Sequence, residues 1–237
     1  MHPTQPTHEH HHRKVQGGAA RAAVFGVSDG LVSNVSLILG VAGANTSPGV
    51  VRLAGLAGLV GGAFSMASGE YVSMKAQREL LERELDLERI EITRRPENER
   101  RELAQIYRSR GIDPTLAEDL ATEMHRNPEL ALETHAREEL GIDPDELGSP
   151  VHAALSSFVA FAGGAVLPLV PWFFAGGTGA MLASVVIGAL SALAVGAALA
   201  TFTGRPVVRL AGRQLGFAAA AAGVAFLVGN AVGVGVV

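Results

Sequence analysis

Five long apolar stretches constrain the fold of this chain more than any other feature. A helix of about 20 apolar residues crosses the hydrocarbon core of a bilayer, and it bonds its own backbone groups where no water can do so. The stretches cover approximately residues 21–44, 51–74, 151–175, 179–203 and 212–237. The sequence therefore predicts an all-α membrane protein with five transmembrane helices.

Most charged residues lie between the second and third apolar stretches. Residues 75–150 hold 20 of the 23 acidic and 12 of the 19 basic residues of the chain. Good helix formers continue from the second stretch through Arg95, so we expect one long helix that leaves the membrane and ends before Pro96. Start and stop signals then predict three short helices, which end at Gly111, before Pro128 and at Gly141.

The Lys and Arg residues in the short connections of the spans predict the orientation. They precede the first span, follow the second and separate the fourth from the fifth, whereas the other two connections between spans contain none. By the positive-inside rule, the N-terminus and the insert lie in the cytoplasm and the C-terminus lies outside. We expect a disordered His-rich N-terminus, two spans, a cytoplasmic helical insert and three further spans, over residues 1–20, 21–74, 75–150 and 151–237.

Asp29 lies roughly 12 Å into the first span, counted at 1.5 Å per residue. An ionisable group at such a depth costs roughly 2.5–3.5 kcal/mol on insertion scales, and it usually faces a pathway or a partner. Ser33 and Ser36 share its helical face by their spacing. An aspartate that merely reaches headgroup water is the alternative. Gly26 and Gly30 flank Asp29 and favour the functional interpretation, because they let another helix approach.

The second span carries Met66 and Glu70 one helical turn apart. This spacing places a thioether and a carboxylate on one face of the helix. A methionine in a membrane helix is usually only packing, but the neighbouring Glu70 and an opposing Asp29 favour a ligand. Sulfur combined with oxygen suits a first-row divalent ion better than calcium or magnesium. Asp29, Met66 and Glu70 are therefore the candidate transport pathway.

The insert contains acidic and imidazole side chains at helical spacing. The pairs are Glu88 with Glu91, Glu99 with Glu102, and His135 with Glu139. Like charges at this spacing destabilise a helix by a few tenths of a kcal/mol unless a cation lies between them. Because arginines are interspersed with these glutamates, a solvated charged face is the alternative to a metal site. The residue types alone leave both interpretations open.

Several classes of site are excluded or disfavoured. The chain contains no cysteine, so disulfides and thiolate ligands are excluded. It has no phosphate-binding loop, no dinucleotide-binding glycine motif and no HExxH zinc motif. A membrane ferroxidase is disfavoured because the Glu-x-x-His signature of di-iron sites is missing. We expect neither enzymatic activity nor a prosthetic group, and no nucleic acid as a partner.

Two further patterns have weaker meaning. The cluster of His8, His10, His11 and His12 binds metal loosely, or it belongs to a polar leader or a cloning remnant. Four GxxxG pairs favour close helix packing or dimerisation; they are Gly26/Gly30, Gly58/Gly62, Gly212/Gly216 and Gly229/Gly233.

From about Arg21 to its C-terminus, the sequence resembles the vacuolar iron transporter family. The resemblance is carried, in order, by FGVSDGLVSNVSLILGV, GLVGGAFSMASGEYVSM, the acidic insert, and EELG followed by SPVHAALSSFVAF. It implies a homodimer of five-helix chains that exports Fe²⁺, and often Mn²⁺, from the cytoplasm in exchange for protons. It also implies that Asp29 and Met66 line the transport pathway at the dimer interface.

The resemblance further implies that the insert is a metal-binding domain. The implied ligands are Glu88, Glu91, Glu99, Glu102 and Glu139. Where the family can offer a methionine one turn before the last glutamate, this chain has His135. An imidazole still suits Fe²⁺, Mn²⁺ or Zn²⁺, but it changes the metal preference of the site.

We therefore expect a proton-coupled divalent-metal exporter in a cell membrane, or in the vacuolar membrane if the source is eukaryotic. A membrane-anchored metal sensor or buffer is the alternative from another class. Asp29 discriminates between the two, because an anchor has no use for a carboxylate within the membrane whereas a proton-coupled carrier needs one.

Overall fold

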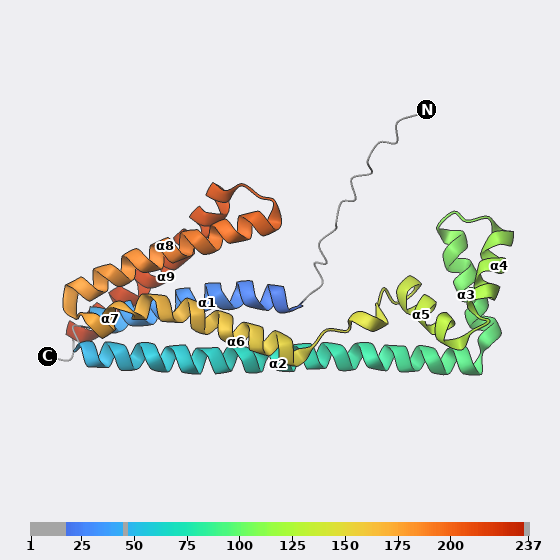
Figure 1. The fold of residues 1–237 in the computed structure, drawn as a ribbon, viewed down its shortest axis with the longest axis horizontal. Coiled ribbons are helices and arrows are strands. Elements are labelled where there is room, and N and C mark those ends of the chain that lie inside the picture. Colours follow the sequence, from blue (N-terminus) through green and yellow to red (C-terminus); the bar gives the residue numbers. More distant parts are fainter. Residues whose placement is uncertain (1–17, 45–46, 235–237) are drawn as a thin grey trace, which may run out of the picture. The chain divides into compact units, whose positions relative to one another are not determined.

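The computed structural model describes residues 18–44 and 47–234 (Figure 1). These residues form helices and no strand, and five of the helices are long and apolar enough to cross a membrane. The prediction of an all-α membrane protein with five spans is confirmed. The N-terminal histidine cluster lies outside the described residues. By its internal contacts the chain divides into two compact units, residues 18–63 with 156–234, and residues 64–155.

The first unit is a helix bundle that depends on glycine. Helix α1 (Gly18–Gly43) packs against α8 (Gly177–Thr203) and α9 (Val207–Val234). A Cβ atom at Gly229 would overlap the carbonyl group of Gly40, so α1 and α9 approach within backbone contact. By contrast, nothing described lies within 4 Å of a Cβ built at Gly212 or Gly216. The Gly229/Gly233 pair thus serves helix packing within the chain, whereas no described residue covers the Gly212/Gly216 pair.

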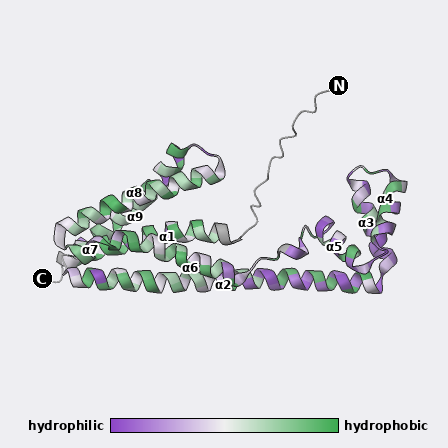
Figure 2. Cartoon of the chain, viewed as in Figure 1, coloured by the Kyte–Doolittle hydropathy of each residue, from purple (hydrophilic) through white to green (hydrophobic). Residues whose placement is uncertain are grey.

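Helix α2 (Pro48–Arg94) is continuous over 47 residues. At 1.5 Å per residue it is about 70 Å long, more than twice the thickness of a bilayer core. Figure 2 shows its apolar beginning and its strongly polar end. It stops just before Pro96, as predicted, because the residue before a proline disfavours the helical conformation.

The third span differs from its prediction as one helix over 151–175. It consists of α6 (Pro150–Val166), the short 3₁₀ turn η2 (Leu167–Leu169) and α7 (Pro171–Phe174). Pro168 and Pro171 break the helix, since proline has no N–H group and its ring clashes with the preceding turn. Helix α8 compensates for the break: Ser184 Oγ donates to the carbonyl of Pro168 at 2.7 Å and accepts the Trp172 indole N–H at 2.9 Å.

The second unit combines the polar end of α2 with α3 (Pro96–Ser109), α4 (Pro114–Met124), α5 (Pro128–Glu138) and the 3₁₀ turn η1 (Pro144–Glu146). The three short helices are confirmed within a few residues of their predicted ends. Each begins with proline, whose missing N–H is no loss there. The side chains of Asp113 and Asn127 accept hydrogen bonds from the first turns of α4 and α5. Two small apolar clusters, Leu103–Ala104–Ala121 and Leu85–Ala136–Ile142, hold the helices together.

Candidate metal centre and transport residues

His135 lies between two carboxylates in the second unit. It comes from the last turn of α5 and is fully buried, and Glu88 of α2 is 4% exposed. The Nδ1 atom of His135 is 3.1 Å from Glu88 Oε1 and 3.0 Å from Glu139 Oε2. A single ring nitrogen therefore faces two acidic groups from two different helices.

Glu88 also belongs to a second acidic group. One carboxylate oxygen from each of Glu88, Glu91 and Glu99 lies within 4.8 Å of the others. Glu99, in the first turn of α3, is only 6% exposed. Carboxylates this close repel each other, the more so where two of the three are buried, and a cation or a proton between them relieves that repulsion. Because Glu88 is shared, both groups form one cluster built from α2, α3 and α5.

Glu102 lies in the next turn of α3, and its side chain is exposed. Partial burial, reinforced by the negative charges of Glu139 and Glu88, raises the pKa of Glu102 above its usual value. Burial likewise raises the pKa of Glu99, with contributions from Glu88, Glu102 and Glu91. The structure thus brings five of the six predicted ligands into two overlapping groups, and Glu102 interacts with them through its charge.

The charge of this cluster is partly compensated by His135. Burial by itself lowers the pKa of the imidazole, but the close contacts with the carboxylates of Glu88 and Glu139 and their negative charges outweigh it and raise the pKa to about 8. At neutral pH the ring is therefore mainly protonated and occupies the position between the two carboxylates as a cation. A metal ion that binds His135 Nδ1 must first displace this proton.

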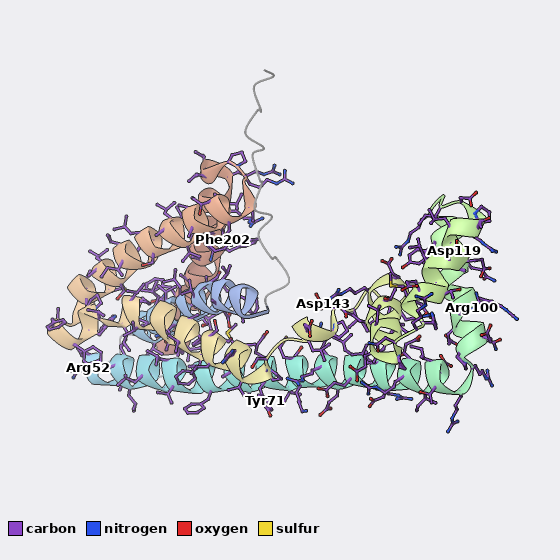
Figure 3. All side chains as sticks on the ribbon, turned by 45° about the vertical axis from the view of Figure 1, so that its right-hand side comes forward. Arg52, Tyr71, Arg100, Asp119, Asp143 and Phe202 are labelled. Atoms are coloured by element: carbon purple, nitrogen blue, oxygen red, sulfur yellow. The ribbon has the colours of Figure 1, made fainter. Side chains whose placement is uncertain are left out.

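The arginines of the insert pair with other carboxylates. Arg100 on α3 contacts Glu97 at 3.1 Å and Glu118 at 2.8 Å, and Figure 3 shows it beside α4, which carries Asp119. Arg137 contacts Glu133 at 2.7 Å. Arg100 and Arg137 thus pair with carboxylates other than the candidate metal ligands.

One histidine near the cluster was not predicted. His125 follows the last turn of α4, and its ring centroid is 5.2 Å from that of His135, with the ring planes at 86°. Its Nδ1–H donates to the carbonyl of Ala121 at 2.9 Å. The residue three positions before it is Thr122, so a search for Glu-x-x-His motifs passes over it. Only the packing of α4 against α5 brings the two rings together.

The transport candidates of the spans lie on α1 and α2. The side chains of Asp29 and Ser33 are exposed in the described chain, and the Ser33 hydroxyl donates to the backbone carbonyl of Asp29 at 2.5 Å. Gly26 and Gly30 are buried against the backbone of α6. The helix that approaches α1 at these two glycines is therefore a helix of the same chain.

Met66 and Glu70 are half-buried one turn apart on α2. They belong to the second unit, whereas Asp29 belongs to the first. The opposition of Met66 and Glu70 to Asp29 stays a prediction.

Comparisons with known proteins give the family. A sequence model of the VIT family matches residues 20–230, which include both units. The chain belongs to the VIT family. Vacuolar iron transporter 1 of Arabidopsis thaliana is 32% identical over 94% of this chain and 91% of its own length. Vacuolar iron transporter 1 of Oryza sativa subsp. japonica is 32% identical over 84% and 81%, and the vacuolar iron transporter of Acanthamoeba castellanii is 38% identical over 67% and 58%.

This membership confirms the resemblance inferred from the sequence motifs. The named relatives are transporters rather than enzymes, in agreement with the expectation that this VIT-family chain has no enzymatic activity.

Proposed function

We propose that this VIT-family protein transports divalent metal ions, with Fe²⁺ as cargo and Mn²⁺ as a second substrate, and that it exchanges them for protons. The names of its relatives support iron as the cargo. The observation that carries the proposal is the cluster around His135: the carboxylates of Glu88 and Glu139 contact its imidazole, and Glu88 also lies beside Glu91 and Glu99. Oxygen and imidazole ligands suit Fe²⁺, Mn²⁺ and Zn²⁺.

The cluster is the capture site of this mechanism. Its ligands are Glu88, Glu91, Glu99, Glu102, Glu139 and His135. An incoming ion takes the place of the His135 proton and neutralises the repulsion between the carboxylates. The cluster therefore already exchanges metal for proton before any ion reaches the membrane.

Asp29, Met66 and Glu70 form the pathway through the bilayer in this proposal. A carboxylate in lipid must hold either a cation or a proton, since an uncompensated charge there is too costly. That competition at Asp29 couples metal movement to proton movement. The exposed side of α1 at Asp29 and Ser33 fits a pathway completed by a second copy of the chain, that is, a homodimer.

The direction of transport follows from the distribution of Lys and Arg, which places the insert and the N-terminus in the cytoplasm. Metal captured by the insert therefore leaves the cytoplasm, across a cell membrane or, in a eukaryote, across the vacuolar membrane. A membrane-anchored sensor or buffer is the second candidate, because every ligand of the cluster belongs to the second unit alone.

Metal-driven proton flux distinguishes the proton-coupled transporter from the membrane-anchored sensor or buffer. The full chain is placed in liposomes that contain a pH probe, and Mn²⁺ is added on one side. Asp29→Asn keeps the size of the side chain but removes its charge, so we expect it to abolish the proton flux while Mn²⁺ binding by the chain persists. Asp29→Glu, which keeps the charge, is the control and should retain measurable flux.

Wild-type rate and pH dependence in Asp29→Asn would show the carrier mechanism to be wrong. Binding of Mn²⁺ by the wild type without any flux would favour the sensor or buffer.

A further inference from the structure

Two buried histidine nitrogen atoms in the described part of the second unit lack hydrogen-bond partners. They are Nε2 of His125 and Nε2 of His135, and neither has a hydrogen-bond partner among the described residues. Their rings are neighbours, with centroids 5.2 Å apart. Buried polar atoms are nearly always bonded, so two adjacent exceptions require an explanation.

The tautomer of His125 is fixed by its backbone contact. The carbonyl of Ala121 only accepts hydrogen bonds, so Nδ1 of His125 carries the proton that is donated to it. In the neutral ring this leaves Nε2 without a proton. Its Nε2 atom therefore presents a lone pair, which is an acceptor.

His135 has the opposite requirement when it binds metal. Its Nδ1 atom faces Glu88 and Glu139, so an ion held by these carboxylates meets the imidazole at Nδ1. Once the ion has replaced the proton on Nδ1, the imidazole of His135 is neutral and carries its single proton on Nε2. That N–H group is a buried donor in need of an acceptor.

The separation of the rings suits a hydrogen bond between these two atoms. Two imidazoles joined head-on by an N–H···N bond of about 3 Å have their centres about 5 Å apart. The observed separation of 5.2 Å already satisfies this condition. The bond requires a change in ring orientation, since neither Nε2 atom has a partner in the structure described.

We propose that His125 is a positioning residue of the metal centre, whose Nε2 atom accepts the Nε2 proton of His135 when His135 binds the cargo ion through Nδ1. Metal-ligating histidines almost always donate their second ring N–H to such a partner, which fixes the ring and strengthens it as a ligand. This role rests on the proposed function of the cluster as a metal site. It gives α4, which supplies none of the predicted ligands, a part in metal binding.

Three substitutions of His125 separate this role from a purely structural one. Gln places an acceptor oxygen near the position of Nε2. Asn keeps a donor for the Ala121 carbonyl but offers no acceptor at that position. Phe keeps the ring and its packing and removes both nitrogens.

The measurement is Mn²⁺ affinity of the full chain in detergent. The background carries Gln at His2, His8, His10, His11 and His12, so that the N-terminus binds no ion. We expect His125→Asn and His125→Phe to lose about 10- to 100-fold in affinity, the usual effect of removing such a partner. His125→Gln should recover most of the loss. Wild-type affinity in His125→Phe, or equal affinities of the Gln and Asn variants, would overturn the proposal.

Pulsed EPR of the same samples with one equivalent of Cu²⁺ gives a second readout. It counts coordinated imidazoles and reports the quadrupole coupling of the remote ring nitrogen, which changes with the hydrogen bond of its proton. We expect one coordinated imidazole in the wild type and an altered coupling in His125→Phe. Two coordinated imidazoles would overturn the proposal, because His125 would then be a ligand itself.

His135→Ala distinguishes failure of this inference from failure of the proposed function. Loss of Mn²⁺ binding in His135→Ala together with full binding in His125→Phe refutes the positioning role only. Full Mn²⁺ binding in His135→Ala refutes the metal site, and the role of His125 with it.

Discussion

The affinity of the chain for Mn²⁺ should fall as the pH drops, because the ion competes with a proton on His135. The contacts with Glu88 and Glu139 raise the pKa of this imidazole to about 8. Below that pH the proton must leave before metal binds, so each further pH unit weakens binding about tenfold, and above it the dependence disappears. Between about pH 8.5 and 6.5 the dissociation constant should therefore rise roughly 25-fold.

The assay is a titration of the full chain with Mn²⁺ over this range, alongside His135→Gln, which keeps a polar side chain but cannot titrate. Burial also raises the pKa of Glu99 and Glu102, whereas the charge of His135 lowers both. The pH dependence that persists in His135→Gln is therefore an upper limit for the contribution of these carboxylates. The Gln variant should bind more weakly at the upper end of the range and vary much less with pH. Equal pH dependence in both proteins would refute the reasoning.

Two other predictions test the membrane part. Gly229→Ala should destabilise the purified protein by about 1–3 kcal/mol, as overpacking does, because the added Cβ would overlap the backbone of α1. Thermal unfolding measures the effect, and Gly216→Ala, where nothing described lies near the added Cβ, is the control. Equal unfolding midpoints of the two variants would contradict the packing of α1 against α9. Alkaline phosphatase fused after Val237 should be active in a bacterial host and inactive when fused at Asn127, since only the C-terminus is expected outside; the reverse pattern would overturn the topology.

Local signals were sufficient to predict the helices of this chain. From Met74 to Arg95 the sequence contains no proline or glycine, so the extension of α2 follows directly from helix propensity. Prolines and glycines likewise punctuate α3, α4 and α5. Hydropathy alone misjudged the third span, because the apolar character of Pro168 and Pro171 conceals their inability to continue a helix.

The candidate metal site was only partly predictable. Helical spacing identifies Glu88 with Glu91 and Glu99 with Glu102 as pairs, but it does not say that α3 and α5 bring them to one point. His125 gives no signal at all in the sequence, since its relation to His135 arises from the packing of two short helices. Tertiary contacts of this kind lie beyond any pattern of local spacing.

The break in the third span has a consequence for the assembly of the protein in the membrane. Helix α6 has 17 residues, about 25 Å at 1.5 Å per residue, which is short for a hydrocarbon core of about 30 Å. The segment that completes the crossing exposes the Pro168 carbonyl and the Trp172 indole N–H, and both find their partner in Ser184 of α8. These two groups thus gain their hydrogen bonds only after α8 has been synthesised. The third span and α8 should therefore enter the bilayer together as a hairpin rather than one after the other.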